Sequence, residues 1–406
     1  MDTNDAKKLK KKSATGIILV MFKTNYKFFL ALLISTLFPW NAIKADSENT
    51  LNMLSIEPGF KIEIFVDNID TPRQIAQSTS GNIFVGSKNG GIINAILPDK
   101  SIRTIAKGLK YATGVTFYDG DLYFSEINNI WKIENIDQHL EQSMALPPKT
   151  LVTNNLPSNP WHGWKWIDFG PDGYLYLAVG VPCNVCNPAN EAEYDFDKRF
   201  GAILRLSEDN QWEYVATGVR NSVGFDWHPT TKKLYFGDNG RDWMGDDLPS
   251  CELNRVDLEG QSFGFPFKHA TNVLDPEYGS KITNDMNFVD PILEIGAHVA
   301  PTGLTFYDGE MLPKKYKNTI FMALHGSWNR TRKSGYKILA AHFDDQGELI
   351  GYEDFITGWL QREGTKETVL GRPANVFQMQ DGSLLISDDK ALSLIHISEP
   401  TRRRHI

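Results

Sequence analysis

The chain has 406 residues, of which 41% are hydrophobic and ten are Trp, and its formal net charge is −8. This apolar content is enough for a large core, and the length alone suggests two or three domains unless the chain is built from repeats. The acidic balance leaves no basic stripe, which argues against nucleic acid as a partner.

Residues 1–45 are predicted to be a signal-peptide region. Lys23 and Lys27 precede an apolar run over residues 28–34, and Met21 is an alternative start. This region carries eight Lys and two Asp, a net +6, so its removal takes the charge from −8 to −14. The pattern predicts a periplasmic or secreted protein that meets the membrane only through its export signal. An uncleaved anchor is the alternative, although the run is shorter than the roughly 20 residues of a membrane span.

A hairpin pattern recurs along residues 46–391, which we expect to form one domain. In each copy an apolar strand precedes a turn, usually with Gly, and a second aromatic or aliphatic strand. The six copies are Ile75–Gly86, Val115–Glu126, Ile167–Gly180, Phe225–Asp238, Leu304–Leu324 and Val376–Asp388. Units of about 40 to 80 residues with three or four strands each predict an all-β, six-bladed β-propeller. A sandwich or two smaller β domains is the alternative.

The two ends of this domain bear on how the ring closes. Phe60–Val66 alternates cleanly and is predicted to pair as the outer strand of the last blade, which removes an exposed edge. After Ala391 a Gly and a closing strand are expected, but the chain reads LSLIHISEPTRRRHI, which resembles a translated sequencing adapter. We therefore predict that residues 392–406 are a non-native tail and that the last blade is truncated. A genuine tail with a basic end is the alternative.

Long insertions separate the predicted strands. They are residues 157–165, 182–199, 237–251, 265–299 and 325–335. Functional residues of propellers gather in such loops on one face.

The three cysteines indicate a disulfide rather than a metal centre. Cys183 and Cys186 form a CxxC motif, and Cys251 lies far from them. No second CxxC or His pair in register completes a zinc site. In an exported protein a Cys183–Cys186 disulfide is favoured, with Cys251 left free.

The segment from residue 216 to 254 combines groups that suit a bound anion beside a cation. Arg220 and Asn221 precede a strand, and a loop rich in Gly and acidic residues follows from Gly237 to Asp247. The fork of an Arg fits a carboxylate. Oxygen-rich loops suit calcium, with Asp247 as a candidate ligand. A solvated surface loop is the alternative.

Three histidines lie in loops beside Gly, Pro or Trp. His162, in the segment NPWHGW, is the candidate general base, because imidazole is well matched to proton transfer near neutral pH. A stacked structural histidine is the alternative. For His298 and His325 a structural or cofactor-contact role is favoured over that of base.

Four arginines, Arg220, Arg330, Arg332 and Arg372, lie in loops near the predicted blade boundaries. Several arginines on one face of an acidic protein would need an anionic ligand, although any one alone is more often a surface ion pair. The sequence contains no GxGxxG, P-loop or GxSxG motif, so a nicotinamide site, a nucleotide site and a nucleophile elbow have no support.

With these residues in place, the chain resembles the sorbosone dehydrogenase family, relatives of the soluble quinoprotein glucose and aldose dehydrogenases. The resemblance runs from about Gly59 to Lys390. It rests on the His162 loop with GPDGYLYLAVG, on GVRNSVGFDWHP, on DNGRDWMGDDLPSCELN with GFPF after it, and on HGSWNR and GRPANV. The family fold is a six-bladed propeller with calcium-bound pyrroloquinoline quinone (PQQ) on its axis. The resemblance therefore implies PQQ and Ca²⁺ as cofactors.

The resemblance also implies roles for matched residues. His162 resembles the general base, and Arg220 and Asn221 resemble the pair beside the reactive quinone carbonyl. Gly240 and Arg241 resemble the positions whose backbone carbonyls hold the calcium.

Further cofactor contacts are implied by two other motifs. HGSWNR contributes His325, Trp328 and Arg330, and GRPANV contributes Arg372. Arg330 and Arg372 fall where basic residues hold the PQQ carboxylates.

The implied activity is oxidation of an aldose sugar or sugar aldehyde, with electrons passed to a quinone or cytochrome-type acceptor. Glucose-oxidising members have a Gln where this chain reads Tyr111–Gly114, so the substrate's identity does not transfer. The alternatives are a calcium-dependent lactonase-type hydrolase and a non-enzymatic binding propeller. Lactonase chemistry wants several side-chain ligands at the axis, whereas the acids here cluster in a single loop.

Overall fold

The computed structural model describes residues 47–142, 145–187 and 197–399. The predicted signal region and the alternative start at Met21 lie outside the described residues. In the described ranges, no helix is long and apolar enough to cross a membrane.

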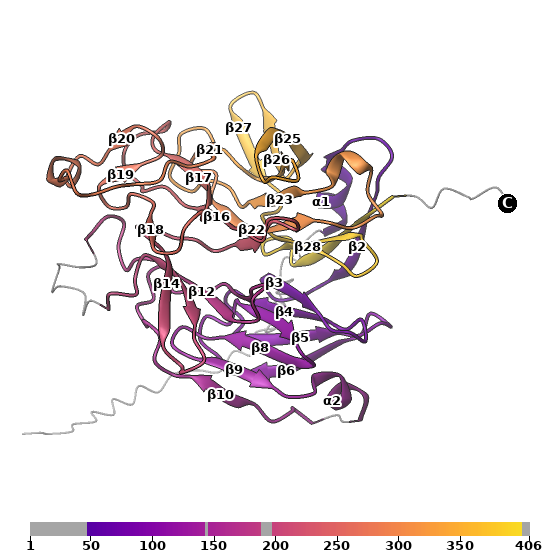
Figure 1. Cartoon of the computed structure of the whole chain (residues 1–406). Coiled ribbons are helices and arrows are strands. Elements are labelled where there is room, and N and C mark those ends of the chain that lie inside the picture. The colour runs from indigo at the N-terminus through magenta and orange to yellow at the C-terminus, as the bar shows by residue number, and fades with distance from the viewer. Residues whose placement is uncertain (1–46, 143–144, 188–196, 400–406) are drawn as a thin grey trace, which may run out of the picture. The chain divides into compact units, whose positions relative to one another are not determined.

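Six antiparallel sheets form the blades of a β-propeller, which confirms the predicted fold class (Figure 1). Each predicted hairpin supplies the two inner strands of one blade. From the axis outward, the first three blades are β3 (Pro72–Gln77), β4 (Ile83–Ser87), β5 (Ile92–Ile96) and β6 (Ile102–Lys107); β7 (Val115–Tyr118), β8 (Asp121–Ser125), β9 (Ile130–Ile133) and β10 (Thr150–Thr153); and β11 (Ile167–Phe169), β12 (Leu175–Val179), β13 (Ala202–Leu206) and β14 (Trp212–Thr217).

The remaining blades follow the same order. They are β15 (Phe225–Trp227), β16 (Leu234–Asp238), β17 (Ser250–Arg255) and β21 (Leu293–Ala297); β22 (Pro301–Tyr307), β23 (Thr319–Leu324), β24 (Lys337–Phe343) and β25 (Leu349–Thr357); and β28 (Pro373–Gln378), β29 (Leu384–Asp388), β30 (Ser393–Ser398) and β2 (Lys61–Asp67). The inner strands contact one another around the axis, for example β3 with β7 and β28 with β3.

Smaller elements decorate the blades. Two short strands, β1 (Ser55–Ile56) and β18 (Gln261–Ser262), extend the fifth and third blades, and two small hairpins stand apart, β19 (Lys268–His269) with β20 (Val273–Leu274) and β26 (Leu360–Glu363) with β27 (Lys366–Val369). The helices are α1 (Ser47–Met53) and α2 (Ile136–Gln142), with short 3₁₀ turns at Gly279–Lys281 and Lys314–Tyr316.

Local sequence explains why the hairpins form. The turn between β7 and β8 is Asp119–Gly120, and both residues have positive φ, 48° and 86°. A two-residue Asp-Gly turn of this kind matches the twist of the strands it joins. Along each strand, successive side chains point to opposite faces of the sheet. The apolar faces of neighbouring blades can therefore pack against each other. Phe84 of the first blade and Phe124 of the second share one such buried cluster.

The ring closes between the two ends of the described chain. As predicted from Phe60–Val66, β2 is the outer strand of the last blade, where it pairs with β30. The prediction that this blade lacks a strand is wrong. β30 lies within the predicted tail, pairs with both β29 and β2, and buries Leu394, Ile395 and Ile397 completely. Its apolar residues supply the alternating face that the blade needs.

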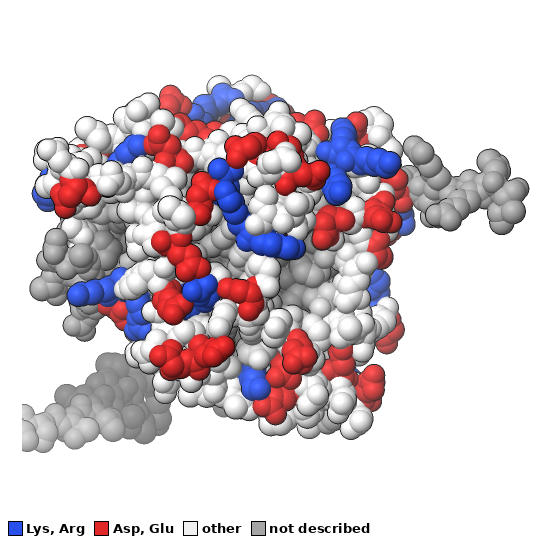
Figure 2. Space-filling view, viewed as in Figure 1, with Lys and Arg blue, Asp and Glu red and all other residues white. Residues whose placement is uncertain are grey.

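Charge is mixed over the surface. On the face viewed in Figure 2, acidic and basic side chains are interspersed. A mixture of this kind produces no extended field of one sign over that face.

Candidate active site

A cavity of about 300 Å³ lies at one end of the inner strands. Its walls come from the starts of these strands and from four of the five long insertions. The residues predicted from the sequence that line it are His162, Arg220, Asn221, Gly240, His298, His325, Trp328 and Arg372. Its volume falls at the lower end of small-molecule sites, which span about 300–1,000 Å³.

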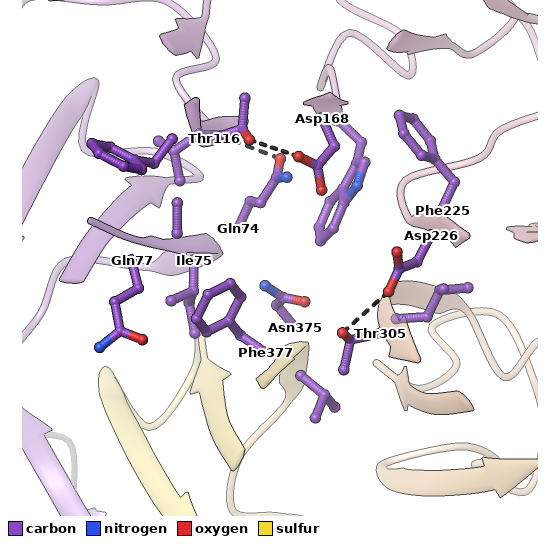
Figure 3. Close-up of a pocket in the computed structure, with 16 residues that line it drawn as sticks. Gln74, Ile75, Gln77, Thr116, Asp168, Phe225, Asp226, Thr305, Asn375 and Phe377 are labelled. Atoms are coloured by element: carbon purple, nitrogen blue, oxygen red, sulfur yellow. Dashed lines mark hydrogen bonds between the residues drawn. The ribbon is translucent and has the colours of Figure 1, made fainter. Parts of the chain in front are cut away.

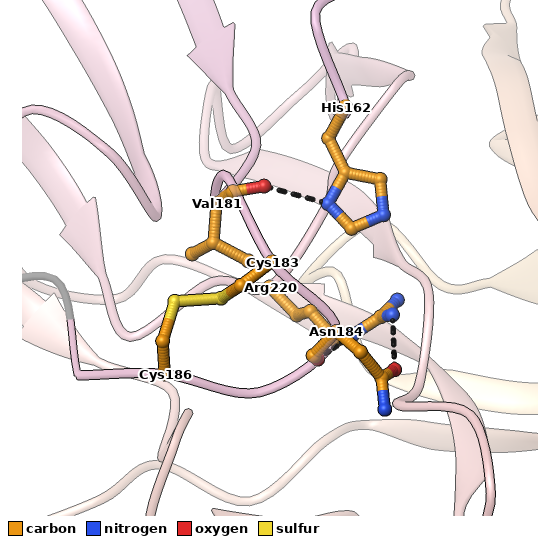
Figure 4. The surroundings of a disulfide bond; sticks show 6 residues. All are labelled: His162, Val181, Cys183, Asn184, Cys186 and Arg220. Atoms are coloured by element: carbon orange, nitrogen blue, oxygen red, sulfur yellow. Dashed lines mark hydrogen bonds between the residues drawn. A yellow bond between two sulfur atoms is a disulfide. The ribbon is translucent and has the colours of Figure 1, made fainter. Parts of the chain in front are cut away.

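His162 is arranged as a proton acceptor (Figure 4). Its Nδ1 lies 2.8 Å from the carbonyl oxygen of Val181, so Nδ1–H donates there and Nε2 keeps its lone pair. Burial lowers the pKa of His162 well below its ordinary value, and the charge of Arg220 lowers it further. The imidazole is therefore neutral at neutral pH, which is the form that can accept a proton.

The backbone around His162 explains this placement. Its φ is 52°, a left-handed conformation that is uncommon for a residue with a side chain. Gly180 lies close against it, because a Cβ at Gly180 would stand 2.7 Å from the Cβ of His162 and 2.5 Å from Oδ1 of Asn221. The final Gly of GPDGYLYLAVG thus leaves room for two site residues.

Arg220 is held by protein contacts on several sides. Its Nε and Nη2 donate to the backbone oxygen and to Oδ1 of Asn184, both at 2.9 Å, and its Nη1 donates to the carbonyl of Asn239 at 3.1 Å. The backbone N–H groups of Arg220 and Asn221 donate to the carboxylate of Asp238 at 2.8 and 2.7 Å. The guanidinium therefore reaches the cavity already oriented.

The predicted disulfide supports this arrangement. Cys183 and Cys186 are bonded, and Asn184 lies between them, beside Arg220 (Figure 4). Cys251 is free, as predicted. It is also buried, and it lines the cavity. Burial raises the pKa of its thiol. The CxxC loop thus braces a residue that orients Arg220.

A second group of cations lines the opposite blades. Arg73 and Lys88 pair with Asp389 at 2.8 and 3.4 Å, and His325 Nε2 lies 2.9 Å from the same carboxylate. Burial lowers the pKa of His325 to about 3, so it donates as a neutral imidazole. Arg372 donates from Nε to the carbonyl of His325 at 3.0 Å. Two cations, Arg73 and Lys88, share one carboxylate here, and Arg372 adds a third positive charge beside them, which leaves positive charge facing the cavity.

Sequence reasoning missed Arg73, Lys88 and Asp389. Arg73 adjoins the Pro that begins β3, just as Arg372 adjoins the Pro that begins β28. A basic residue beside the first Pro of an inner strand was therefore a usable signal. Lys88 follows β4 and Asp389 follows β29, the second strands of their blades, and no Pro adjoins either residue.

The structure does not bring every predicted side chain to the cavity. Arg330 pairs with Asp247, whose side chain is 85% exposed, so the two neutralise each other across neighbouring loops. The side chain of Arg241 pairs with Asp275, and Arg332 pairs with Glu367. The expected role of Arg241 is to bind calcium through its backbone carbonyl. The side-chain contact does not test this role, which stays a prediction.

Several polar atoms of the cavity wall have no hydrogen-bond partner. They are Oδ1 of Asn221, both amide atoms of Asn329 and Nε1 of Trp164. Buried polar atoms are normally paired, so these atoms fit a polar ligand. The described residues contain no group of three or more His, Cys, Asp or Glu that could hold a metal. A cation in this cavity would therefore need backbone carbonyls, such as that of Gly240, and oxygens of the ligand itself.

The fold and the site define a class: a six-bladed propeller whose axial cavity holds a neutral histidine among cations. The family model for glucose/sorbosone dehydrogenase matches residues 138–328. An uncharacterized protein of Borreliella burgdorferi is 34% identical over 367 residues, which cover 88% of this chain and 94% of that protein. The chain belongs to the glucose/sorbosone dehydrogenase family, which supports a general dehydrogenase role.

Solved structures share the fold at low sequence identity. The holo form of the pyranose dehydrogenase PQQ domain from Coprinopsis cinerea matches with a TM-score of 0.68 and 17% identity, covering 85% of this chain and 97% of that one. The calcium structure of a family AA12 enzyme from Trichoderma reesei matches with a TM-score of 0.69 and 18% identity, covering 86% and 97%. At these identities the matches establish the fold.

Proposed function

We propose that the protein is a PQQ- and calcium-dependent dehydrogenase that oxidises an aldose sugar or a sugar aldehyde. The observation that carries the proposal is the free Nε2 of His162 in one cavity with the braced pair Arg220–Asn221. The family supports it, and so do the structural neighbours, which include a PQQ domain of a pyranose dehydrogenase and a calcium structure of a family AA12 enzyme. A periplasmic or secreted location and a quinone or cytochrome-type acceptor belong to the same proposal and rest on the sequence alone.

The residues present fit the proposed cofactor. PQQ is a tricarboxylate, and Arg73, Lys88 and Arg372 offer three cations on one side of the cavity. The unpartnered Oδ1 of Asn221 and the two unpartnered amide atoms of Asn329 suit its further polar atoms. The backbone carbonyls of Gly240 and Arg241 would hold the calcium. When bound, PQQ would supply a quinone that can accept a hydride, which carries the two electrons of the oxidation.

The chain's own residues then have defined tasks. Nε2 of His162 takes the proton from the substrate's hydroxyl group, a contribution of about 10²–10⁴-fold in rate. The guanidinium of Arg220 places positive charge where negative charge develops, and its protein contacts keep it from reorganising. The walls would position the substrate carbon against the cofactor, which is a contribution that the protein adds to the chemistry of a cofactor.

The test is a matched pair of histidine variants. His162→Gln should lower kcat for dye reduction by about 10²-fold or more, because the base is lost. PQQ binding, followed by absorbance, should be kept. His139→Gln on α2, outside the cavity, is the control and should leave both unchanged. Unaltered turnover in His162→Gln would remove His162 as the base.

The lactonase alternative receives no support from the site. It needs several side-chain ligands for a metal in the candidate active site, and the described part of the chain has no group of three or more His, Cys, Asp or Glu that could hold one. Asp247, the candidate calcium ligand of the acidic loop, is exposed and pairs with Arg330.

A further inference from the structure

A second cavity, of about 210 Å³, lies farther along the axis (Figure 3). All six inner strands line it, and it shares no lining residue with the candidate active site. A much smaller cavity of about 20 Å³, lined by Gln74 and Trp166 among others, lies between the two. The second cavity is therefore a separate compartment of the propeller axis.

Two carboxylates from neighbouring blades line this compartment. Asp168 is the middle residue of β11, and Asp226 is the middle residue of β15. Thr116 on one side donates to Oδ1 of Asp168 at 2.6 Å, and Thr305 on the other side donates to Oδ2 of Asp226 at 3.2 Å. The result is an arc of oxygen-bearing side chains from four consecutive blades, visible in Figure 3.

Backbone amides hold the two carboxylates in place. Phe169 N–H donates to Oδ1 of Asp168 at 2.8 Å, and Phe306 N–H donates to Oδ2 of Asp226 at 2.7 Å. No donor from the described residues contacts Oδ2 of Asp168. The carboxylates are fixed, but their oxygens keep lone pairs for a further partner.

The part of the chain that the structure describes supplies no paired countercharge to these two carboxylates. Within the described residues, no Lys, Arg or His forms an ion pair with Asp168 or Asp226. Burial raises the pKa of Asp168 to about 6 and, together with the charge of Asp168, raises that of Asp226 to about 7. Two neighbouring carboxylates without a cation repel each other, and burial adds to this cost.

An unpartnered amide oxygen completes the set of possible metal ligands. Asn375 is 1% exposed, lines the same cavity, and its Oδ1 has no hydrogen-bond partner. Figure 3 shows its amide between Gln74, Asp226 and Thr305. Two carboxylates and an amide oxygen, all hard donors in a space with room for water, suit a divalent cation that prefers oxygen.

We propose that Asp168, Asp226 and Asn375 form an axial binding site for a hydrated divalent cation of the calcium class. The site is distinct from the calcium position proposed beside Gly240. It does not depend on the proposed dehydrogenase activity, because its residues do not line the candidate active site.

The test uses the full chain without PQQ. Calcium bound per chain is measured by equilibrium dialysis for the wild type, for the double variant Asp168→Asn/Asp226→Asn and for Asp168→Asn alone. At position 168 the single oxygen of Asn can still accept the backbone hydrogen bond from Phe169 N–H. At position 226 it can accept only one of the two backbone hydrogen bonds, which come from Trp227 N–H and Phe306 N–H. Asp119→Asn, in an exposed turn, is the control for lost charge. Thermal unfolding of each variant is followed with and without calcium.

The wild type and Asp119→Asn should bind one more calcium ion per chain than the double variant. Calcium should raise the melting temperature of the wild type by a few degrees more than that of the double variant. Without calcium Asp168→Asn should melt no lower than the wild type, because the repulsion is gone and the backbone hydrogen bond from Phe169 is kept. Equal calcium binding in wild type and variants overturns the proposal and leaves a pair that shares only a proton. If the double variant does not fold, the calcium bound per chain is compared between the wild type and Asp168→Asn alone.

Discussion

His162 is prepared for proton transfer by three neighbours rather than by its own chemistry. Val181 fixes the tautomer, burial and Arg220 keep the ring neutral, and Gly180 leaves the space the ring needs. The sequence pointed to His162 through its unusual loop. It could not show Val181 or Gly180 as partners, because these contacts arise only when β11 and β12 pair and bring the loops before and after the hairpin together.

The space at Gly180 provides a direct prediction. Gly180→Ala should displace His162 or Asn221 and lower kcat by about 10²-fold, the loss that a misplacement of about 1 Å can cause. The measurement is dye-linked turnover together with a thermal melt. The control is Gly351→Ala, where an added Cβ meets nothing within 4 Å. If Gly180→Ala keeps full turnover, the close packing has no catalytic role.

Lys165 is a buried cation with one weak contact, a hydrogen bond of 3.2 Å from Nζ to the carbonyl of Gly163. Burial lowers its pKa from 10.5 to about 7. The folded state thus disfavours the charged form. This penalty is fully present below pH 7 and disappears as the pH rises through 10.5, the unfolded value.

Lys165→Met should therefore raise the free energy of unfolding by a few kcal/mol at pH 6. The gain should shrink steadily and approach zero near pH 10 to 11, the unfolded pKa of a lysine. Denaturant unfolding at several pH values measures it. A gain that does not change with pH would contradict the assigned cause.

At the scale of elements, the short CxxC loop positions Arg220. Cys183→Ser/Cys186→Ser should free Asn184 and lower kcat several-fold, while His162 and the cations stay in place. Asn184→Ala, which removes the side-chain contact with Arg220, should show a similar loss with the disulfide intact. Turnover at the wild-type level in both variants would mean that Arg220 needs no such brace.

The closing strand β30 makes a second prediction at this scale. Ile395 is fully buried in the cluster between the fifth and sixth blades. Ile395→Ala should lower the free energy of unfolding by about 2–5 kcal/mol, the usual cost of emptying such a site. His396→Ala, on the opposite face of the strand, should cost much less. Equal effects would show that β30 does not close the ring.

The inner strands were predictable, and many of the outer ones were not. Each inner hairpin has its own alternation and a turn signal such as Asp119–Gly120. An outer strand such as β25 has a largely exposed surface, so its sequence carries little alternation. β30 was misjudged because its apolar pattern was set aside in favour of the adapter-like composition around it.

At the scale of the whole molecule, the candidate site is assembled from residues that are far apart in the chain. Arg73 meets Asp389, and Arg220 meets Asn239 and Asn184 across separate loops. No local pattern encodes such pairs. The family resemblance identified the residues that carry chemistry. The contacts that orient these residues and balance their charges could be identified only from the folded propeller.

The central claim is tested most directly by titrating the purified protein with PQQ and calcium while following absorbance and dye reduction with a panel of aldoses. The proposed function predicts saturable PQQ binding and calcium-dependent dye reduction with at least one sugar. It also predicts that His162→Gln keeps the binding and loses the turnover. Absence of PQQ binding in the presence of calcium would contradict it and would favour a propeller that binds some other ligand.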